Sequence, residues 1–341
     1  MTKNTSIASL GEFGLIDRLT ENWPSFQPST LKGIGDDAAV IAAGDQVLVV
    51  TTDLLLEGIH FNLMYTPLKY LGYKAVVVNL SDVYAMNALP KQITVSIGIS
   101  SRFTLEMVEE LYQGIRAACE KYQVDLAGGD TSSSLTGMVI SITALGTTAR
   151  GEVTYRSGAS PNDLLCVSGD LGGAYMGLQL LERENEVFKV NPQMKPKLEG
   201  FDYILQRQLK PEARYDIPGI FKNLDIRPTS MIDISDGLSS EILHLCKASG
   251  VGCRLHEDKI PYDEQTRDMA LEMNINPLVA ALNGGEDYEL LFTIPIADFD
   301  KVKNDTDITV IGHMTRPEDG AMLVTGAGAL IPLVAQGFKH M

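Results

Sequence analysis

Short apolar blocks alternate with polar ones along this chain, and their spacing predicts strands and helices in turn. Two apolar runs, Ala38–Ile41 and Val47–Thr52, are joined by a turn-forming segment and predict a hairpin. After Pro67, which is typical of a first helical position, residues Leu68–Ala88 predict a long and largely buried helix. We therefore expect strands and helices to be mixed from the start of the chain.

The remaining pattern extends this alternation. Before the hairpin, apolar residues at helical spacing predict a helix across residues Glu12–Trp23. Thr104 is a suitable cap for a helix whose first turn is acidic. Further strands are predicted at Gln92–Ser100, Val124–Ala127, Met138–Leu145, Leu164–Val167, Met231–Ile234 and Glu289–Ile294. Helices are predicted at Ala174–Leu181 and Leu238–Ala248. The fold class is therefore α/β (α+β).

The chain has 341 residues, which favours two domains over one ordinary core. We place the boundary after residue 149, giving an N-terminal domain over residues 1–149 and a C-terminal α/β domain over residues 150–341. Residues 182–200 are charged and contain two prolines, so we expect a mobile surface segment or a lid there. The glycine-rich turn at residues 168–173 suits either a phosphate or close packing, and the pattern leaves both open.

Aspartate recurs beside small polar residues at the ends of apolar runs. Asp36 and Asp37 lie between a glycine pair and a strand, and Asp53 ends the next strand. Asn79 and Asp82 share a face of the long helix, where a buried carboxylate without a cation is costly. One such site alone is more often a solvated turn. Because the pattern recurs at Gly129–Asp130 and Asp233–Asp236, we predict carboxylates that hold a divalent cation.

Composition narrows the partners. The formal net charge of −16 argues against a nucleic-acid or anionic-membrane surface, but not against phosphates bridged by metal ions. Hydrophobic residues make up 45% and charged residues 21%, as in a globular protein with a large core. No stretch has the length of a membrane span and no signal sequence is recognisable. The four cysteines have no zinc or disulfide spacing, so we predict a cytoplasmic protein.

Several nucleotide motifs are absent. The chain has no P-loop, no G-x-G-x-x-G after a strand, no protein-kinase motif set and no G-x-S-x-G elbow. A nucleotide would therefore be held through carboxylate-bound Mg2+ rather than by a lysine cradle.

Seven segments, in order, resemble the motifs of the thiamine-monophosphate kinase family. They are Gly33–Ala38, Thr52–Phe61, Asn79–Asp82, Gly128–Thr131, Arg156–Ala159, Asp233–Leu238 and Gly284–Phe292. They span nearly the whole chain. The resemblance implies ATP-dependent phosphorylation of thiamine phosphate to thiamine diphosphate. It also implies a homodimer formed through the strands of the N-terminal domain, which binds ATP and Mg2+.

The resemblance also implies roles for individual residues. Several Mg2+ ions would be bound by Asp37, Thr51, Thr52, Asp53, Asp82, Asp130, Asp233 and Asp236. ATP would contact Tyr112, Gly129, Asp130, Arg156 and Ser235. Thiamine phosphate would contact His60, Glu286 and Phe338. No general base is implied, since the acceptor is already a phosphate. Residues Ser132 and Ser133 stand where many relatives have threonine and arginine, so a phosphate contact from that arginine is in doubt.

Two other readings stay open. Related enzymes use ATP to activate an amide or carboxylate oxygen and release phosphate. A non-catalytic sensor of a nucleotide or of thiamine phosphate would be expected to lack metal-site acids, and every motif aspartate is present here.

Overall fold

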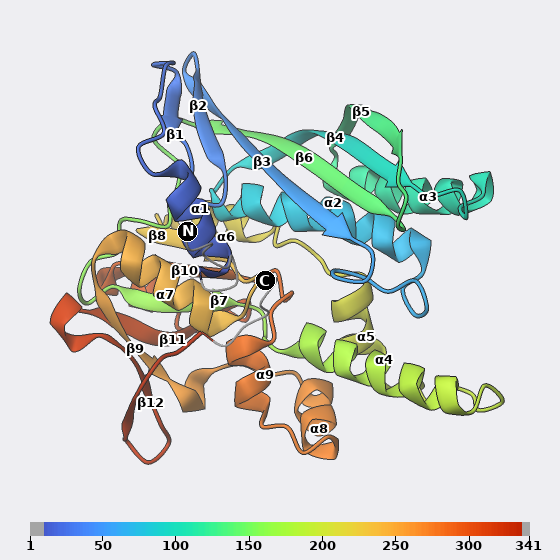
Figure 1. The fold of residues 1–341 in the computed structure, drawn as a ribbon. Coiled ribbons are helices and arrows are strands. Elements are labelled where there is room, and N and C mark those ends of the chain that lie inside the picture. The colour runs from blue at the N-terminus through green and yellow to red at the C-terminus, as the bar shows by residue number, and fades with distance from the viewer. Residues whose placement is uncertain (1–9, 336–341) are drawn as a thin grey trace, which may run out of the picture.

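The structure, a computed structural model, describes residues 10–335. The first half of the chain forms a sheet with two long helices (Figure 1). Its elements are α1 (Gly11–Thr20), β1 (Thr30–Lys32), β2 (Ala39–Ala43), β3 (Gln46–Leu56), α2 (Leu68–Ala85), β4 (Leu89–Ile99), α3 (Leu105–Tyr122), β5 (Asp125–Ser133) and β6 (Val139–Ala149).

This first sheet has the strand order β1-β2-β3-β6-β4-β5. Strands β3 and β6 pair over their full length, from Gln46 with Ala149 to Leu56 with Val139. Alternate residues of β3 are buried under α2, whereas those between them, such as Thr52 and Leu54, point to the other face and are exposed. Figure 1 shows both long helices on one side of this sheet. The residues that the structure describes therefore leave the other face of this sheet open.

The second half forms a sheet with helices on both sides. Its elements are β7 (Leu164–Ser168), α4 (Gly173–Val190), α5 (Asp202–Leu209), α6 (Ile217–Leu224), β8 (Ser230–Asp233), α7 (Leu238–Ser249), β9 (Gly252–His256), α8 (Glu264–Glu272), α9 (Pro277–Asn283), β10 (Leu290–Ile294), α10 (Phe299–Val302), β11 (Ile308–Thr315), β12 (Ala321–Val324) and β13 (Leu330–Pro332). The strand order is β13-β12-β9-β11-β7-β10-β8.

Helix α2 packs against both halves of the molecule. Nearly all of its side chains are buried, from Leu71 to Ala85, because it lies between the first sheet and the second (Figure 1). A single apolar core includes Val76 of α2 together with Phe292 of β10. The other side of the second sheet has a core of its own, with Leu291 and Ile242. An aspartate on α2 is thus placed directly against the second half of the chain.

The mixed α/β class with two sheets is confirmed, and most predicted elements are present with shifted ends. Two differ more. Strand β5 continues to Ser133 through the Gly-Gly-Asp motif, because parallel pairing with β4 satisfies its backbone. Residues 182–190, predicted as part of a mobile segment, are the second half of α4. Charged residues there form ion pairs along the helix, as Lys189 does with Glu186. A high content of charged residues therefore did not indicate a segment without helical structure. Among the described helices, none combines the length and apolarity that crossing a bilayer requires.

Candidate active site

Three carboxylates from distant parts of the chain meet where α2 faces the second sheet. Oxygens of Asp37, Asp82 and Asp233 all lie within 4.8 Å of one another. Asp37 precedes β2, Asp82 is on α2, and Asp233 ends β8. We call these three residues the acid cluster. Like charges held this close and away from water repel, so the arrangement favours a bound cation or bound protons.

Hydroxyl groups orient two members of the acid cluster. The Thr51 hydroxyl donates to Asp82 Oδ2 at 2.5 Å, and the Ser81 hydroxyl donates to Asp233 Oδ2 at 2.6 Å. The second bond crosses from the first half of the chain to the second. Asn79, which also lies on α2, accepts the backbone N–H of Asp53 at 3.1 Å and so holds β3 against α2.

Without a cation, burial disfavours the ionised form of these acids and raises their pKa values. It raises the pKa of Asp37 to about 7, with repulsion from Asp233 adding to the rise and Arg156 opposing it. Burial also raises the pKa of Asp233 and of Asp53, each to about 6. The pKa of Asp82 lies well above its ordinary value because burial is reinforced by Asp53 and Asp233. Shifts of this kind concentrate at functional sites.

The adjacent Asp36 and Asp37 do not act as a pair. Asp37 points into the acid cluster, where its Oδ1 accepts from the Arg156 guanidinium at 2.6 Å while its buried Oδ2 has no hydrogen-bond partner among the described residues. Asp36 accepts the backbone N–H of Arg156 at 3.1 Å, and its other oxygen lies 3.5 Å from Lys32. Asp36 therefore anchors the turn, and Asp37 is the residue available to a metal.

His60 is held by the backbone of its own loop. Its Nδ1 accepts the N–H of Leu56 at 3.0 Å. Because Nδ1 is the acceptor, the neutral ring carries its proton on Nε2, which is then a donor rather than a base. Such a group can bind and orient a phosphate.

Two further predicted residues lie next to each other on neighbouring turns. The backbone N–H of Glu286 donates to the carbonyl of Ser235 at 2.7 Å. Gly285 makes this approach possible, since its φ is +70° and a Cβ there would lie 2.4 Å from the same carbonyl oxygen. Asp236 follows Ser235, and its N–H donates to the buried Glu241 at 2.8 Å. The turn after β8 and the turn before β10 thus form one surface.

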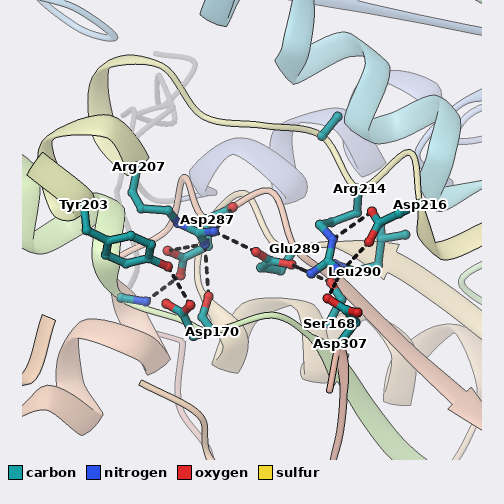
Figure 2. Close-up of polar contacts among 12 residues, drawn as sticks. Ser168, Asp170, Tyr203, Arg207, Arg214, Asp216, Asp287, Glu289, Leu290 and Asp307 are labelled. Atoms are coloured by element: carbon teal, nitrogen blue, oxygen red, sulfur yellow. Dashed lines mark hydrogen bonds and ion pairs between the residues drawn. The ribbon is translucent and has the colours of Figure 1, made fainter. Parts of the chain in front are cut away.

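A second, largely buried polar cluster includes Asp287 and Glu289, which follow Glu286 in the sequence, and contains two arginines (Figure 2). Arg207 and Arg214 each donate at 2.7 Å to a different oxygen of Glu289. Arg207 also donates to the carbonyl oxygen of Asp287 at 3.1 Å, and the Asp287 carboxylate accepts the N–H of Gly172 at 2.8 Å. We call these residues, with Ser168, Asp170, Tyr203, Asp216 and Asp307, the arginine cluster.

Three of the predicted nucleotide residues form a separate group at the sheet edge, whereas Arg156 binds Asp37 in the acid cluster and Ser235 lies on the turn after β8. Tyr112, Gly129 and Asp130 line a depression of about 340 Å³ beside β5. Asp130 pairs with Ser96, Ser96 with Ser141, and Ser141 with Leu54, which follows Asp53. Three strand spacings, about 14 Å, therefore separate β5 from β3. One chain does not bring this group to the acid cluster.

The first sheet also divides the predicted metal residues between its faces. Asp53 is aligned with the buried residues Ile142 and Val95 under the helices. Thr52 points to the open face, where it donates to the Ile142 carbonyl at 3.1 Å. By the register above, Asp130 shares that open face. Phe338 lies outside the described residues.

Sequence reasoning missed several side chains that support the site. The predicted motif Asn79–Asp82 contains Ser81, but no role was predicted for its side chain, although its bond to Asp233 joins the two halves. Lys74 and Gln208, which contact Glu286, were not predicted at all. A lysine within the apolar run of α2 was the one available signal, since a buried ammonium needs a partner.

Comparison with known proteins identifies relatives over the whole chain. Residues 35–148 match the family described as AIR synthase related protein, N-terminal domain. Thiamine-monophosphate kinase of Aquifex aeolicus (strain VF5) is 36% identical over 335 residues, covering 98% of this chain and 99% of the relative. The Bacillus subtilis (strain 168) enzyme of the same name is 32% identical, covering 97% and 99%.

A solved structure described as "AaThiL complexed with AMPPCP and TMP" superposes with a TM-score of 0.85 at 34% identity, covering 100% of both chains. Similarity at this level, over the full length of both proteins, extends beyond the fold. The chain belongs to the thiamine-monophosphate kinase family.

Proposed function

We propose that this protein transfers the γ-phosphoryl group of ATP to thiamine phosphate and so forms thiamine diphosphate. The observation that carries this is the match, over all of the chain, to a structure described as holding AMPPCP and TMP. The acid cluster adds a chemical reason, because two polyanions can react only where their charge is neutralised.

The residues of the acid cluster fit Mg2+. Its carboxylate oxygens are close together, and the buried Oδ2 of Asp37 has no hydrogen-bond partner among the described residues. Asp37, Asp82 and Asp233 would hold the metal, with Thr51, Asp53 and Asp236 contributing from around them. When bound, Mg2+ would neutralise the charge of the phosphates that react.

The chain's own residues would bind the acceptor phosphate and orient it for transfer. A phosphate monoester has a second pKa of about 6, so at neutral pH the acceptor oxygen is already a nucleophile and needs no base. The Nε2–H of His60 would hold that phosphate, and transfer would be direct and in line, without a phosphoenzyme.

The role of His60 can be tested with His60→Ala. The Michaelis constant for thiamine phosphate should rise about tenfold while turnover falls less, because the ring binds and does not abstract a proton. Incubation with γ-labelled ATP and no acceptor should leave the protein unlabelled. A chemically competent labelled enzyme, or a collapse of turnover with an unchanged Michaelis constant, would contradict the proposal.

We further propose a homodimer in which the partner completes the site. Strand β5 is a sheet edge whose residues are all exposed, and long exposed edges are usually covered. The open face of the first sheet, with Thr52 and Asp130, would lie at the interface. Tyr112, Gly129 and Asp130 of one subunit would then serve the acid cluster of the other.

Subunit mixing tests this arrangement. Asp82→Asn and Asp130→Asn should each be nearly inactive alone. Unfolded together and refolded, they should regain about a quarter of wild-type activity, since half of the dimers are mixed and each mixed dimer has one intact site. A monomer in solution, or no recovery in the mixture, would count against it. The domain division after residue 149 and a cytoplasmic location stay predictions.

The reaction itself is tested by incubating the protein with ATP, Mg2+ and a panel of phosphate acceptors. Mass spectrometry should find thiamine diphosphate and ADP. Release of inorganic phosphate with an amide or carboxylate substrate, or binding without turnover, would favour the alternative readings.

A further inference from the structure

An ion pair between Lys74 and Glu286 joins the two halves of the chain. Lys74 of α2 has a side chain that is only 4% exposed, and its Nζ lies 2.9 Å from Glu286 Oε1. The same ammonium donates to the backbone carbonyl of Gln208 on α5 at 3.1 Å. The Gln208 amide donates to Glu286 Oε2 at 2.9 Å. Each carboxylate oxygen of Glu286 therefore has a partner of its own.

The backbone under Glu286 is also held. Both Glu286 and Tyr288 have positive φ, +58° and +52°, which costs free energy for residues other than glycine. Their N–H groups bond to the carbonyls of Ser235 and Ile234, at 2.7 and 2.9 Å. The residues that alternate with them, Asp287 and Glu289, are contacted by Arg207 in the arginine cluster (Figure 2). Side chains of this segment thus leave it in fixed, alternating directions.

Glu286 is still reachable from outside. Its side chain is 29% exposed although its partners are buried. A carboxylate oxygen can accept more than one hydrogen bond, so the contacts with Lys74 and Gln208 leave room for a ligand. A charge-assisted contact in a partly buried environment is stronger than one in water.

We propose that Lys74 and Gln208 are positioning residues for the acceptor, which hold the Glu286 carboxylate in one orientation toward thiamine phosphate. The inference rests on the proposed function, because it takes Glu286 as a substrate contact. Since Lys74 comes from the first half of the chain and Glu286 from the second, the acceptor site is complete only when α2 is packed against α5.

The experiment compares Lys74→Met and Gln208→Met with a matched control, Tyr73→Phe. Tyr73 neighbours Lys74, and its hydroxyl also crosses to the second half, donating to Glu212 at 2.5 Å, but it does not touch Glu286. Lys74→Met should raise the Michaelis constant for thiamine phosphate about tenfold, and Gln208→Met about threefold. The constant for ATP should change by less than about twofold, and Tyr73→Phe should resemble wild type.

Glu286→Gln alone and combined with Lys74→Met separates positioning from general loosening. If Lys74 acts through Glu286, the double variant should match Glu286→Gln in its Michaelis constant for thiamine phosphate. It should also melt at a higher temperature than Lys74→Met, because no partly buried carboxylate is left without its cation. Gln208→Met keeps the test open if Lys74→Met does not fold.

Three results would overturn the inference. Lys74→Met and Gln208→Met could retain the wild-type Michaelis constant for thiamine phosphate while Glu286→Gln raises it. Tyr73→Phe could raise it as much as Lys74→Met does. Glu286→Gln could leave it unchanged, in which case there is no contact to position. Turnover of thiamine phosphate by the wild-type protein in the same assay shows whether the proposed function itself has failed.

Discussion

The acid cluster and the arginine cluster both bury several carboxylates, but they compensate the charge differently. Glu289 binds two guanidinium groups and the hydroxyl of Ser168. In the acid cluster, the hydrogen bonds to Asp82 and Asp233 come from the hydroxyls of Thr51 and Ser81. Glu289 therefore has two permanent positive charges beside it, because arginine does not lose its proton in proteins. The acid cluster has one guanidinium, that of Arg156 on Asp37, for three carboxylates. It therefore needs a further cation from outside, which marks it as the place where a ligand acts.

The largest expected effect comes from removing one charge of the acid cluster. Asp82→Asn, or Asp53→Asn nearby, should lower turnover by at least about 100-fold, because a neutral amide is a weaker metal ligand and the phosphates lose part of their compensation. The fold should persist, since the substitution also removes a source of repulsion. Steady-state rates at saturating Mg2+ measure the turnover, and circular dichroism shows whether the fold persists. Near-wild-type turnover would remove Asp82 from the site.

In the arginine cluster, neutralising one carboxylate should lower the stability of the fold. Glu289→Gln leaves Arg207 and Arg214 buried with less negative charge and should lower the free energy of unfolding by about 2 kcal/mol. Urea denaturation followed by fluorescence gives this value. Stability within about 0.5 kcal/mol of wild type would show that the two clusters do not differ in the way described.

The smallest effect is a pH dependence of the metal-free protein. Because the pKa of Asp37 is raised to about 7 in the folded state, that state holds a proton that the unfolded chain releases near pH 4. The stabilising effect of this proton is complete below about pH 4 and is lost as the pH rises through about 7. The melting temperature with EDTA should therefore be at least about 2 °C lower at pH 8 than at pH 5.

Mg2+ at pH 8 should restore the lost stability by binding the native state, and Asp37→Asn should show a smaller difference between the two pH values. If the melting temperature depended on pH equally with and without Mg2+, the acid cluster would not be the group that needs a cation.

Local patterns along the sequence predicted much of the fold. The hairpin before Asp53, the capped helix after Thr104 and the buried helix that carries Asp82 are all present. These elements depend on neighbours in sequence, through turn residues, caps and apolar spacing. Strand β5 and the second half of α4 were mispredicted where pairing with a distant strand, or ion pairs along a helix, outweighed local composition.

Side chains that meet only in the folded chain were harder to predict. The aspartates could be found because each lies at one end of an apolar run, yet the sequence does not show that Asp37 faces Asp233 while Asp36 turns toward Lys32. Lys74 and Gln208 are separated by more than a hundred residues and carry no local motif, so their contact was not predictable from spacing.

The bond from Ser81 to Asp233 has a practical consequence for protein engineering. A cut in the connection between β6 and β7 would leave Asp37 and Asp82 on one fragment and Asp233 on the other. Neither fragment could assemble the set of acids alone. Turnover would then report directly on reassociation of the two pieces, as in a fragment-complementation assay.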